Sequence, residues 1–343
     1  MIYVLNQDGT KVLGLIDAYS SAIFTVQYYG LGDFQVITYP KYLDLLVPGN
    51  LLAREADKKG NRFDNVMVIE KTEVKYDREN GNRVTVTGRS LKSILCKRIV
   101  WEQMNLSGPV EDVIRKVVKD NAVSPTNSRR RLPLQLGMIH GLADDGQQTE
   151  VQLFGDNVGD WIATVCKQFG YGWEIYIDNG FIFDLYRGKD RTGSVIFSPG
   201  YDNLNAARYT TGNYYTAALV GGEGEGTSQT VEELGTASGL DRVETYIDAG
   251  SVSSNGEIIT EATYRNMLVN YGKEEVAELN TDTSLDAEIA PYGAFNLGDD
   301  YFLGDVVKIE LQGIQARTRI TEIIYSEDET GARVLPTFAE MEV

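Results

Sequence analysis

Apolar and polar residues alternate along the first 98 positions of the chain, and this period of two predicts β-strands with one buried face. Turns that contain glycine, such as Asp8-Gly9 and Pro48-Gly49-Asn50, separate the alternating runs. We therefore expect a β domain over residues 1–98. Its expected strands are 2–5, 12–16, 23–29, 34–39, 51–54, 66–76 and 84–87.

The pattern changes at residue 99. Apolar residues recur at helical spacing over 110–118, and a second helix is expected after Asn157, a residue type that favours helix N-caps. Alternating apolar positions then flank Asn179-Gly180, which is the strongest short-range signal for a β-hairpin. A helix that packs on a hairpin predicts a small α+β domain over residues 99–206.

A β-rich pattern returns from residue 207 to the end of the chain. Apolar positions over 258–279 predict the longest helix, with Gly272 as a local weakness. The sequence thus predicts an α+β fold that is mainly β, with a second β domain over 207–343 and a helical insertion around 257–280. The expected strands of this part are 214–220, 243–247, 306–311, 317–325 and 334–338.

One strand-turn-strand pattern occurs twice, once near each end of the chain. Glu79-Asn80-Gly81-Asn82-Arg83-Val84 recurs as Glu329-Thr330-Gly331-Ala332-Arg333-Val334, each time after a β-rich run. A second shared element precedes each copy, with Gly49-Asn50 in the first and Gly304-Asp305 in the second. This degenerate repeat predicts two similar β domains, an arrangement more typical of a ring-forming subunit than of an enzyme with one cleft.

The acidic excess of the chain is confined to its last third. Residues 1–218 hold 25 acidic and 25 basic residues, whereas residues 219–343 hold 25 acidic and only 7 basic ones. Such a negative field opposes nucleic-acid binding, because phosphates are repelled from it. Two interpretations remain open: an ordinary solvated surface, or an acidic wall with a purpose.

Composition indicates a soluble folded protein. No apolar run reaches the roughly 20 residues that span a bilayer, so we expect no membrane insertion, and the N-terminus lacks the pattern of a signal peptide. Cys96 and Cys166 lie among apolar neighbours and are interpreted as buried, reduced thiols. Tyrosine (20) outnumbers phenylalanine (11), which suits half-buried sheet faces and protein interfaces.

Four sequence features could carry chemistry, and each has a plainer explanation. His140 is the only histidine, and nothing near it resembles a nucleophile elbow. The glycine-rich run 222–226 lacks the Gly-Lys-Ser/Thr ending of a phosphate loop, so a turn is expected. The basic run 129–131 fits a solvated loop or a contact with phosphate or an acidic partner. Asp299, Asp300 and Asp305 do not have the spacing of a calcium loop.

Paired carboxylates, which glycoside hydrolases need, carry no signal in a chain with 50 acidic residues. We therefore assign no catalytic, cofactor-binding or metal-binding residue, and we expect no cofactor and no enzymatic activity.

Several ordered segments together resemble the phage tail-hub proteins of long-tailed siphoviruses, which also form the hub region of tail-associated lysins and are related to the central baseplate hub of contractile phages. The resemblance covers nearly the whole chain, and Thr227 stands near the position where that family would have an arginine. The segments are Ile16-Asp17-Ala18-Tyr19-Ser20-Ser21, Gly32-Asp33-Phe34-Gln35-Val36, Pro48-Gly49-Asn50, Val86-Thr87-Gly88-Arg89-Ser90-Leu91-Lys92-Ser93-Ile94-Leu95, Arg98-Ile99-Val100-Trp101, Gly193-Ser194-Val195-Ile196-Phe197-Ser198, Asn203-Leu204, Val220-Gly221-Gly222-Glu223-Gly224-Glu225-Gly226, Gly239-Leu240-Asp241-Arg242-Val243-Glu244 and Tyr301-Phe302-Leu303-Gly304-Asp305-Val306-Val307.

The resemblance implies a homotrimer in which each subunit contributes two related antiparallel, tube-type β-barrels. Six barrels would form a pseudo-sixfold ring that continues the tail tube, as the repeat itself suggests. The expected partners are a distal tail or tube protein, a tape measure protein, and a fibre or lysin component. DNA is expected to pass through the lumen without specific binding. The protein is expected in the tail tip of the virion, after assembly in the cytoplasm of the host bacterium.

Two further hypotheses compete with a structural hub. One is a tail-associated enzyme that degrades peptidoglycan or another glycan, an activity that we would expect on an extension after the second repeat copy, whereas the sequence ends at Val343. The other is a carbohydrate-binding receptor module, for which the tyrosine content is weak support. A mass measurement in solution and a zymogram on cell wall separate the three.

Overall fold

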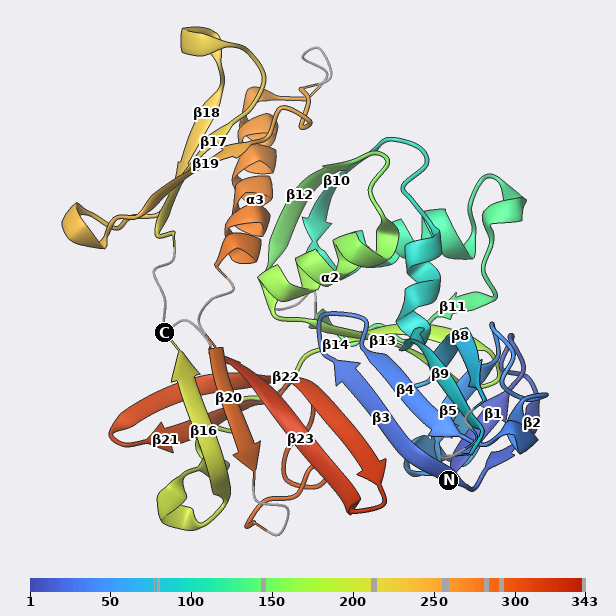
Figure 1. Ribbon diagram of the computed structural model, residues 1–343. Coiled ribbons are helices and arrows are strands. Elements are labelled where there is room, and N and C mark those ends of the chain that lie inside the picture. The colour runs from blue at the N-terminus through green and yellow to red at the C-terminus, as the bar shows by residue number, and fades with distance from the viewer. Residues whose placement is uncertain are drawn as a thin grey trace.

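The computed structural model describes residues 1–76, 78, 81–142, 146–210, 215–254, 259–280, 284–289 and 293–340. The protein is mainly β with a few helices, as the sequence predicts (Figure 1). Within the described residues, no helix is long and apolar enough to cross a membrane.

A 13-stranded sheet contains strands from both ends of the chain. Two of these 13 strands, β15 (Ile196–Phe197) and β21 (Val306–Leu311), lie off its main path, where β15 pairs with β21 and β21 with β22. The pairing of the described strands does not close into either of the two expected barrels, so the barrels remain an expectation. The main path runs β16 (Leu204–Thr210), β20 (Ser284–Ile289), β23 (Gly331–Glu340), β22 (Ile314–Asp328), β3 (Tyr19–Gln27), β4 (Asp33–Thr38), β9 (Arg83–Ser90), β8 (Met67–Lys75), β5 (Leu51–Arg54), β1 (Ile2–Leu5) and β2 (Val12–Ile16).

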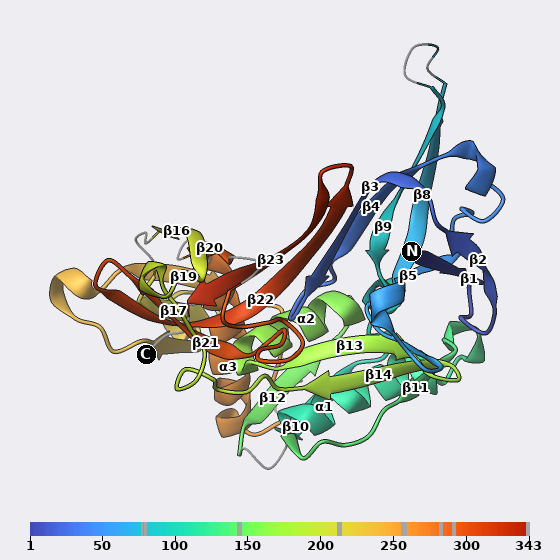
Figure 2. The same ribbon diagram turned by 90° about the horizontal axis from the view of Figure 1, so that it is seen from below.

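Both copies of the repeat form a hairpin. In the first, Lys75 of β8 pairs with Arg83 of β9, and in the second, Asp328 of β22 pairs with Gly331 of β23. Glu79 and Asn80 of the first turn lie outside the described residues. Gly331 has a φ of 126°, a conformation that glycine adopts without strain. The pairing of the two flanking runs is therefore confirmed at both ends of the chain (Figure 2).

The middle of the chain forms α1 (Val110–Val118) and α2 (Val158–Phe169), together with the hairpin of β13 (Gly172–Ile177) and β14 (Phe181–Tyr186). The Asn157 side chain caps α2 by accepting from the backbone N–H groups of Gly159 and Asp160. Both predicted helices and the hairpin are present.

The middle of the chain is not isolated from the first β-rich part. One hydrophobic cluster spans both, with Leu51 and Phe63 on one side and Trp173 and Phe183 on the other. β13 also pairs at Ile177 with the short strand β7 (Arg62–Phe63), which in turn pairs with β6 (Lys58–Lys59). Shared apolar burial and shared backbone pairing therefore join these two parts of the chain.

Helix α3 (Glu261–Leu279) belongs to a larger unit than the predicted helical insertion. It covers one face of a separate three-stranded sheet of β17 (Ala217–Gly221), β18 (Val231–Leu234) and β19 (Glu244–Asp248). Gly272, interpreted as a weakness, allows this contact, because a Cβ there would lie 2.4 Å from a Val220 methyl group. The other side of α3 faces α2 and β12 (Gln148–Leu153), which pairs with β10 (Met104–Pro109) (Figure 1).

Three parts of the chain meet at the turn after β3. The fully buried Tyr28 donates its hydroxyl to the carbonyl of Gly170 (3.1 Å) and accepts from the N–H of Gly188 (3.0 Å). Its backbone N–H donates to the carbonyl of Thr321 in β22 (2.8 Å). Gly304 lies against the Tyr28 ring, where a Cβ would come within 2.2 Å of ring carbon. Tyr28 thus binds the first β-rich part, the middle and the C-terminal part to one another.

Lys92 also stabilises this turn, through hydrogen bonds to its backbone carbonyls. Its buried ammonium donates to the carbonyls of Gln27 and Gly30 (2.7 Å each) and lies 4.8 Å from the centre of the Trp173 ring. The Trp173 indole N–H donates to the carbonyl of Tyr29 (2.5 Å). Burial lowers the pKa of Lys92 from 10.5 to about 7. In the described part of the chain, this ammonium donates to backbone carbonyls and to no carboxylate.

We predict that Lys92 makes the stability of the protein depend on pH. Because the folded protein binds this proton more weakly than the unfolded chain, the free energy of unfolding rises with pH between about 7 and about 10. The Lys92→Met variant lacks this contribution, so the wild-type free energy of unfolding gains about 1–3 kcal/mol on the variant between pH 7.5 and 9.5. Urea unfolding at both pH values measures it. A difference that does not change with pH contradicts the prediction, and exposed Lys11→Met is the control.

Candidate assembly surface

The two β-rich parts that hold the repeat copies are joined by backbone pairing between β3 and β22. The register runs from Gln27 opposite Glu322 to Ser21 opposite Asp328, and the two strands are antiparallel. The Gln27 amide also donates to the Glu322 carboxylate (2.7 Å). One continuous sheet therefore passes from the N-terminal hairpin to the C-terminal hairpin.

Alternation along β3 and β4 separates two faces of this sheet. Ala22, Phe24 and Phe34 are buried, and the two Phe rings stack with centroids 5.8 Å apart. The intervening positions point to the other face, where Ile23 pairs with Gln35 and is partly exposed. We name this second face the open face. The residues at its positions on β3, β4, β9 and β22 are Ser21, Ile23, Thr25, Gln27, Asp33, Gln35, Ile37, Thr85, Thr87, Arg89, Glu322, Ile324, Ser326 and Asp328.

The open face is polar, and its charges have both signs. Arg89 lies opposite Asp33 in the register and pairs with Glu70 at 2.8 Å. Glu322 and Asp328 add negative charge near the joint between the two copies. Apart from Ile23, Ile37 and Ile324, the open face therefore consists of hydroxyl, amide and charged groups.

This sheet has open edges in the described part of the chain. β5 pairs with β8 at Met67 and Val68, and the backbone of Ile69 bonds to Gly49 and Asn50, so the outer edge of β8 beyond Ile69 has no strand partner among the described residues. At the other end, β16 pairs only with β20. Val74 and Tyr76, near the end of β8, are 55% and 77% exposed. Unpaired edges with exposed apolar side chains are templates for pairing with another chain.

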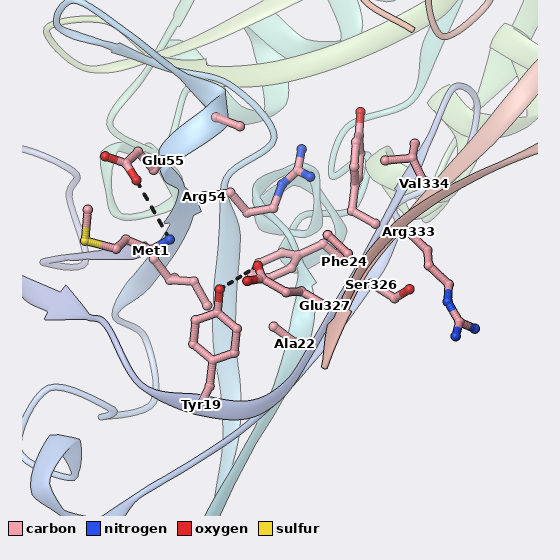
Figure 3. A pocket seen from close by; sticks show the side chains of 14 residues that line it. Met1, Tyr19, Ala22, Phe24, Arg54, Glu55, Ser326, Glu327, Arg333 and Val334 are labelled. Carbon is pink, nitrogen blue, oxygen red and sulfur yellow. Dashed lines mark hydrogen bonds and ion pairs between the residues drawn. The ribbon is translucent and has the colours of Figure 1, made fainter. Parts of the chain in front are cut away.

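A cleft of about 390 Å³ lies on the opposite face of the sheet, where the two copies meet (Figure 3). The Arg54 guanidinium lies 3.4 Å from the centre of the Tyr325 ring and binds both oxygens of Asp57 (2.6 and 2.9 Å). Across the joint, the Tyr19 hydroxyl donates to Glu327 (2.6 Å), and burial together with this carboxylate raises the pKa of Tyr19. These contacts brace the joint, and we name this cleft the braced cleft.

Glu327 and Asp328 illustrate how the acidic residues of the second repeat are distributed. They are consecutive in β22, so their side chains point to opposite faces of the sheet. Glu327 points into the braced cleft and Asp328 belongs to the open face. Part of the acidic excess therefore serves contacts inside the chain.

The single histidine lies at the exposed edge of a buried ionic network that sequence reasoning missed. His140 Nε2 lies 2.9 Å from Asp184, which also pairs with Arg115 at 3.3 Å, and Arg115 pairs with the fully buried Glu111 at 3.0 Å. Glu111 and Arg115 are four residues apart on α1, a spacing that the sequence displays. Asp184 comes from the distant strand β14, and no local pattern indicates that it joins them.

The other features that could carry chemistry have structural roles. Arg130 lies 4.9 Å from the centre of the Trp101 ring, and its guanidinium donates to the carbonyl of Ile99 (2.5 Å). Asp305 is buried, and its carboxylate accepts from the Lys189 N–H and from the Arg191 guanidinium. Within the described ranges, no group of three or more His, Cys, Asp or Glu side chains could hold a metal ion.

The glycine-rich run and the two cysteines likewise have structural surroundings. Gly224 has a φ of 101°, and Glu223 in the same run accepts from Ser253 (2.6 Å) and from the N–H of Ser254 (3.0 Å). Cys96 and Cys166 are free thiols, with Cys166 fully buried and Cys96 half-buried. Burial raises the pKa of the Cys96 thiol to about 11, which disfavours the reactive thiolate form.

Comparison with solved structures identifies phage tail proteins with this fold. The 43 kDa tail protein of prophage MuSo2 from Shewanella oneidensis has a TM-score of 0.61 and 13% identity, and 98% of each chain is covered. A tail protein from Neisseria meningitidis MC58 has a TM-score of 0.59 and 10% identity, with 99% of this chain and 96% of that chain covered. Prophage tail protein gp18 from Listeria monocytogenes EGD-e has a TM-score of 0.57 and 10% identity, with 99% and 94% covered.

A search of curated proteins finds no match to this chain. The sequence profile of one family, described as Siphovirus ReqiPepy6 Gp37-like protein, matches residues 1–338, which is nearly the whole chain. This agrees with the resemblance to siphovirus tail proteins and with the fold shared with prophage tail proteins. The chain therefore belongs to the Siphovirus ReqiPepy6 Gp37-like protein family.

Proposed function

We propose that this protein is the structural hub of a phage or prophage tail tip, and that three copies form a ring that continues the tail tube. The observation that carries the proposal is the sheet that runs without interruption through both repeat copies. Two equivalent units joined side by side in one chain supply one third of a six-unit ring. The membership of the family and the fold of prophage tail proteins support it.

The open edges explain how copies would join. The path from β16 to β8 contains eight strands, and its two outer strands carry the open edges. When β8 of one copy pairs with β16 of the next, the joint between copies resembles the β3–β22 joint within a copy. Such a head-to-tail contact closes into a ring when the rotation between copies is one third of a turn.

The open face then lines the lumen. Its serine, threonine and glutamine side chains and its paired ions give DNA no continuous basic track, so DNA passes without specific binding. Distal tail or tube proteins, a tape measure protein, and a fibre or lysin component are the partners at the two rims of the ring. The work is mechanical and not catalytic, in the tail tip of a virion assembled in the host cytoplasm.

A mass measurement in solution tests the ring directly. Light scattering after gel filtration is expected to show a trimer, or a monomer–trimer equilibrium that shifts toward trimer as protein concentration rises. A strict monomer at every concentration contradicts the proposal. A zymogram on purified cell wall is expected to remain blank, and clear lysis would return the glycan-degrading enzyme as the explanation.

Cysteine cross-linking tests which edges meet. In a background where Cys96 and Cys166 are replaced by serine or alanine, Glu73→Cys on β8 is combined in turn with Asn205→Cys, Ala206→Cys or Arg208→Cys on β16. At least one combination is expected to give oxidation-dependent dimers and trimers on a denaturing gel, because paired strands bring the Cα atoms of one register within the 4.4–6.8 Å range of a disulfide.

The matched control is Glu73→Cys with Leu13→Cys, which places the second thiol on the edge strand β2 outside the eight-strand path. This combination is expected to stay monomeric on the same gel. Equal cross-linking of β2 and β16 would show collision of mobile thiols and would overturn the assignment of the joint.

A further inference from the structure

A cavity of about 280 Å³ lies between the middle of the chain and the unit that contains α3. One wall comes from β12 and the start of α2, and the other comes from α3 and the segment that follows β19 (Figure 1). The described residues that line it belong neither to the open face, nor to the open edges, nor to the braced cleft. None of the roles described above uses it.

Two buried polar atoms in the lining lack a partner. Trp161 is only 7% exposed, and its indole N–H has no hydrogen-bond acceptor among the described residues. The Oε2 atom of Glu150 is also buried and without a hydrogen-bond donor in the same part of the chain. Because an unmet buried polar group costs about 1–3 kcal/mol, two of them in one cavity point to a ligand that satisfies both.

The charge of the lining restricts that ligand. Glu150, Asp156 and Glu274 contribute carboxylates, and no Lys, Arg or His is among the described residues that line the cavity. The field therefore excludes phosphates, sulfates and carboxylates. An ammonium or guanidinium group would suit the glutamates, but it has no lone pair to accept from the Trp161 indole. A hydroxyl group donates to a carboxylate and accepts from an indole, so it matches both orphan atoms.

The rest of the lining supplies apolar surface. Phe154 is 71% exposed, and Met267 and Tyr271 lie along the α3 wall. Sugars have apolar C–H faces between their hydroxyl groups, and aromatic rings cover such faces. The volume lies just below the usual range of small-molecule sites, about 300–1,000 Å³, so it suits one ring and not a long chain. We propose that this cavity binds a neutral sugar unit, through Trp161 and Glu150, with Phe154 against the ring.

The Trp161 indole itself reports the binding. The chain has three tryptophans, so a ¹H–¹⁵N spectrum shows three indole signals, and the Trp161→Phe variant assigns one of them. Glucose, N-acetylglucosamine and rhamnose are the neutral probes, with glucuronic acid as the anionic probe and n-butylammonium as the cationic one. At least one neutral sugar is expected to shift the Trp161 signal saturably. The Trp173 signal is the internal control, because that N–H already donates to Tyr29.

Substitutions then test the partners. Glu150→Gln removes the carboxylate at constant size and is expected to weaken binding at least tenfold, and Phe154→Ala is expected to weaken it severalfold. Glu329→Gln changes an exposed acidic residue in the β22–β23 turn and is expected to leave the affinity unchanged. Retained indole signals of Trp101 and Trp173 show that each variant is folded.

Three results overturn the inference. They are the absence of a saturable Trp161 shift with every neutral sugar, an equal response to glucuronic acid, and a Trp161 shift caused by n-butylammonium alone. The result is independent of the proposed ring, because the mass of the protein in solution is measured separately. A trimer that binds no sugar refutes only the sugar site, and a monomer that binds sugar refutes only the ring.

Discussion

The turn after β3 is the constraint on which the arrangement of the whole chain depends. Tyr28 inserts its ring against two glycines from distant segments, Gly172 and Gly304, while Lys92 ties the carbonyls of the same turn from the other side. Neither glycine tolerates a side chain, since a Cβ at either position would lie 2.2 Å from the Tyr28 ring. If this turn moved, nothing would fix the register between β3 and β22, and the single sheet that depends on this register would be lost.

That register turns two copies of a small β motif into one surface. The polar face, the two open edges and the braced cleft all follow from the side-by-side pairing of β3 with β22. A duplicated domain on a flexible linker would present the same side chains without a fixed geometry. The stacking of Arg54 on Tyr325, with Asp57 binding the guanidinium from the side, stiffens the joint at its back. Arg is well suited to this position because its planar group stacks and forms hydrogen bonds at the same time.

Local features of the fold were predictable from the sequence, and contacts between distant segments were not. The helix over Val110–Val118, the Asn157 cap and the Asn179-Gly180 hairpin each rest on signals within a few residues, and each is present. The three-stranded sheet beside α3 was missed as a unit, because β18 is short and polar and its partner β17 lies on the other side of a glycine-rich turn. The partners of Asp184 and Tyr28 come from remote parts of the chain, and no periodic pattern encodes them.

The joint between β3 and β22 also changes the order of the assembly reaction. Two halves held in one chain meet at an effective concentration in the millimolar range or above, whereas separate subunits meet at the concentration the cell supplies. In a ring of the proposed kind, every second joint is therefore already made when the chain folds, and only the joints between copies depend on dilution. Duplication within one polypeptide replaces a six-body encounter by a three-body one, so the ring can close at protein levels where six single domains would stay apart.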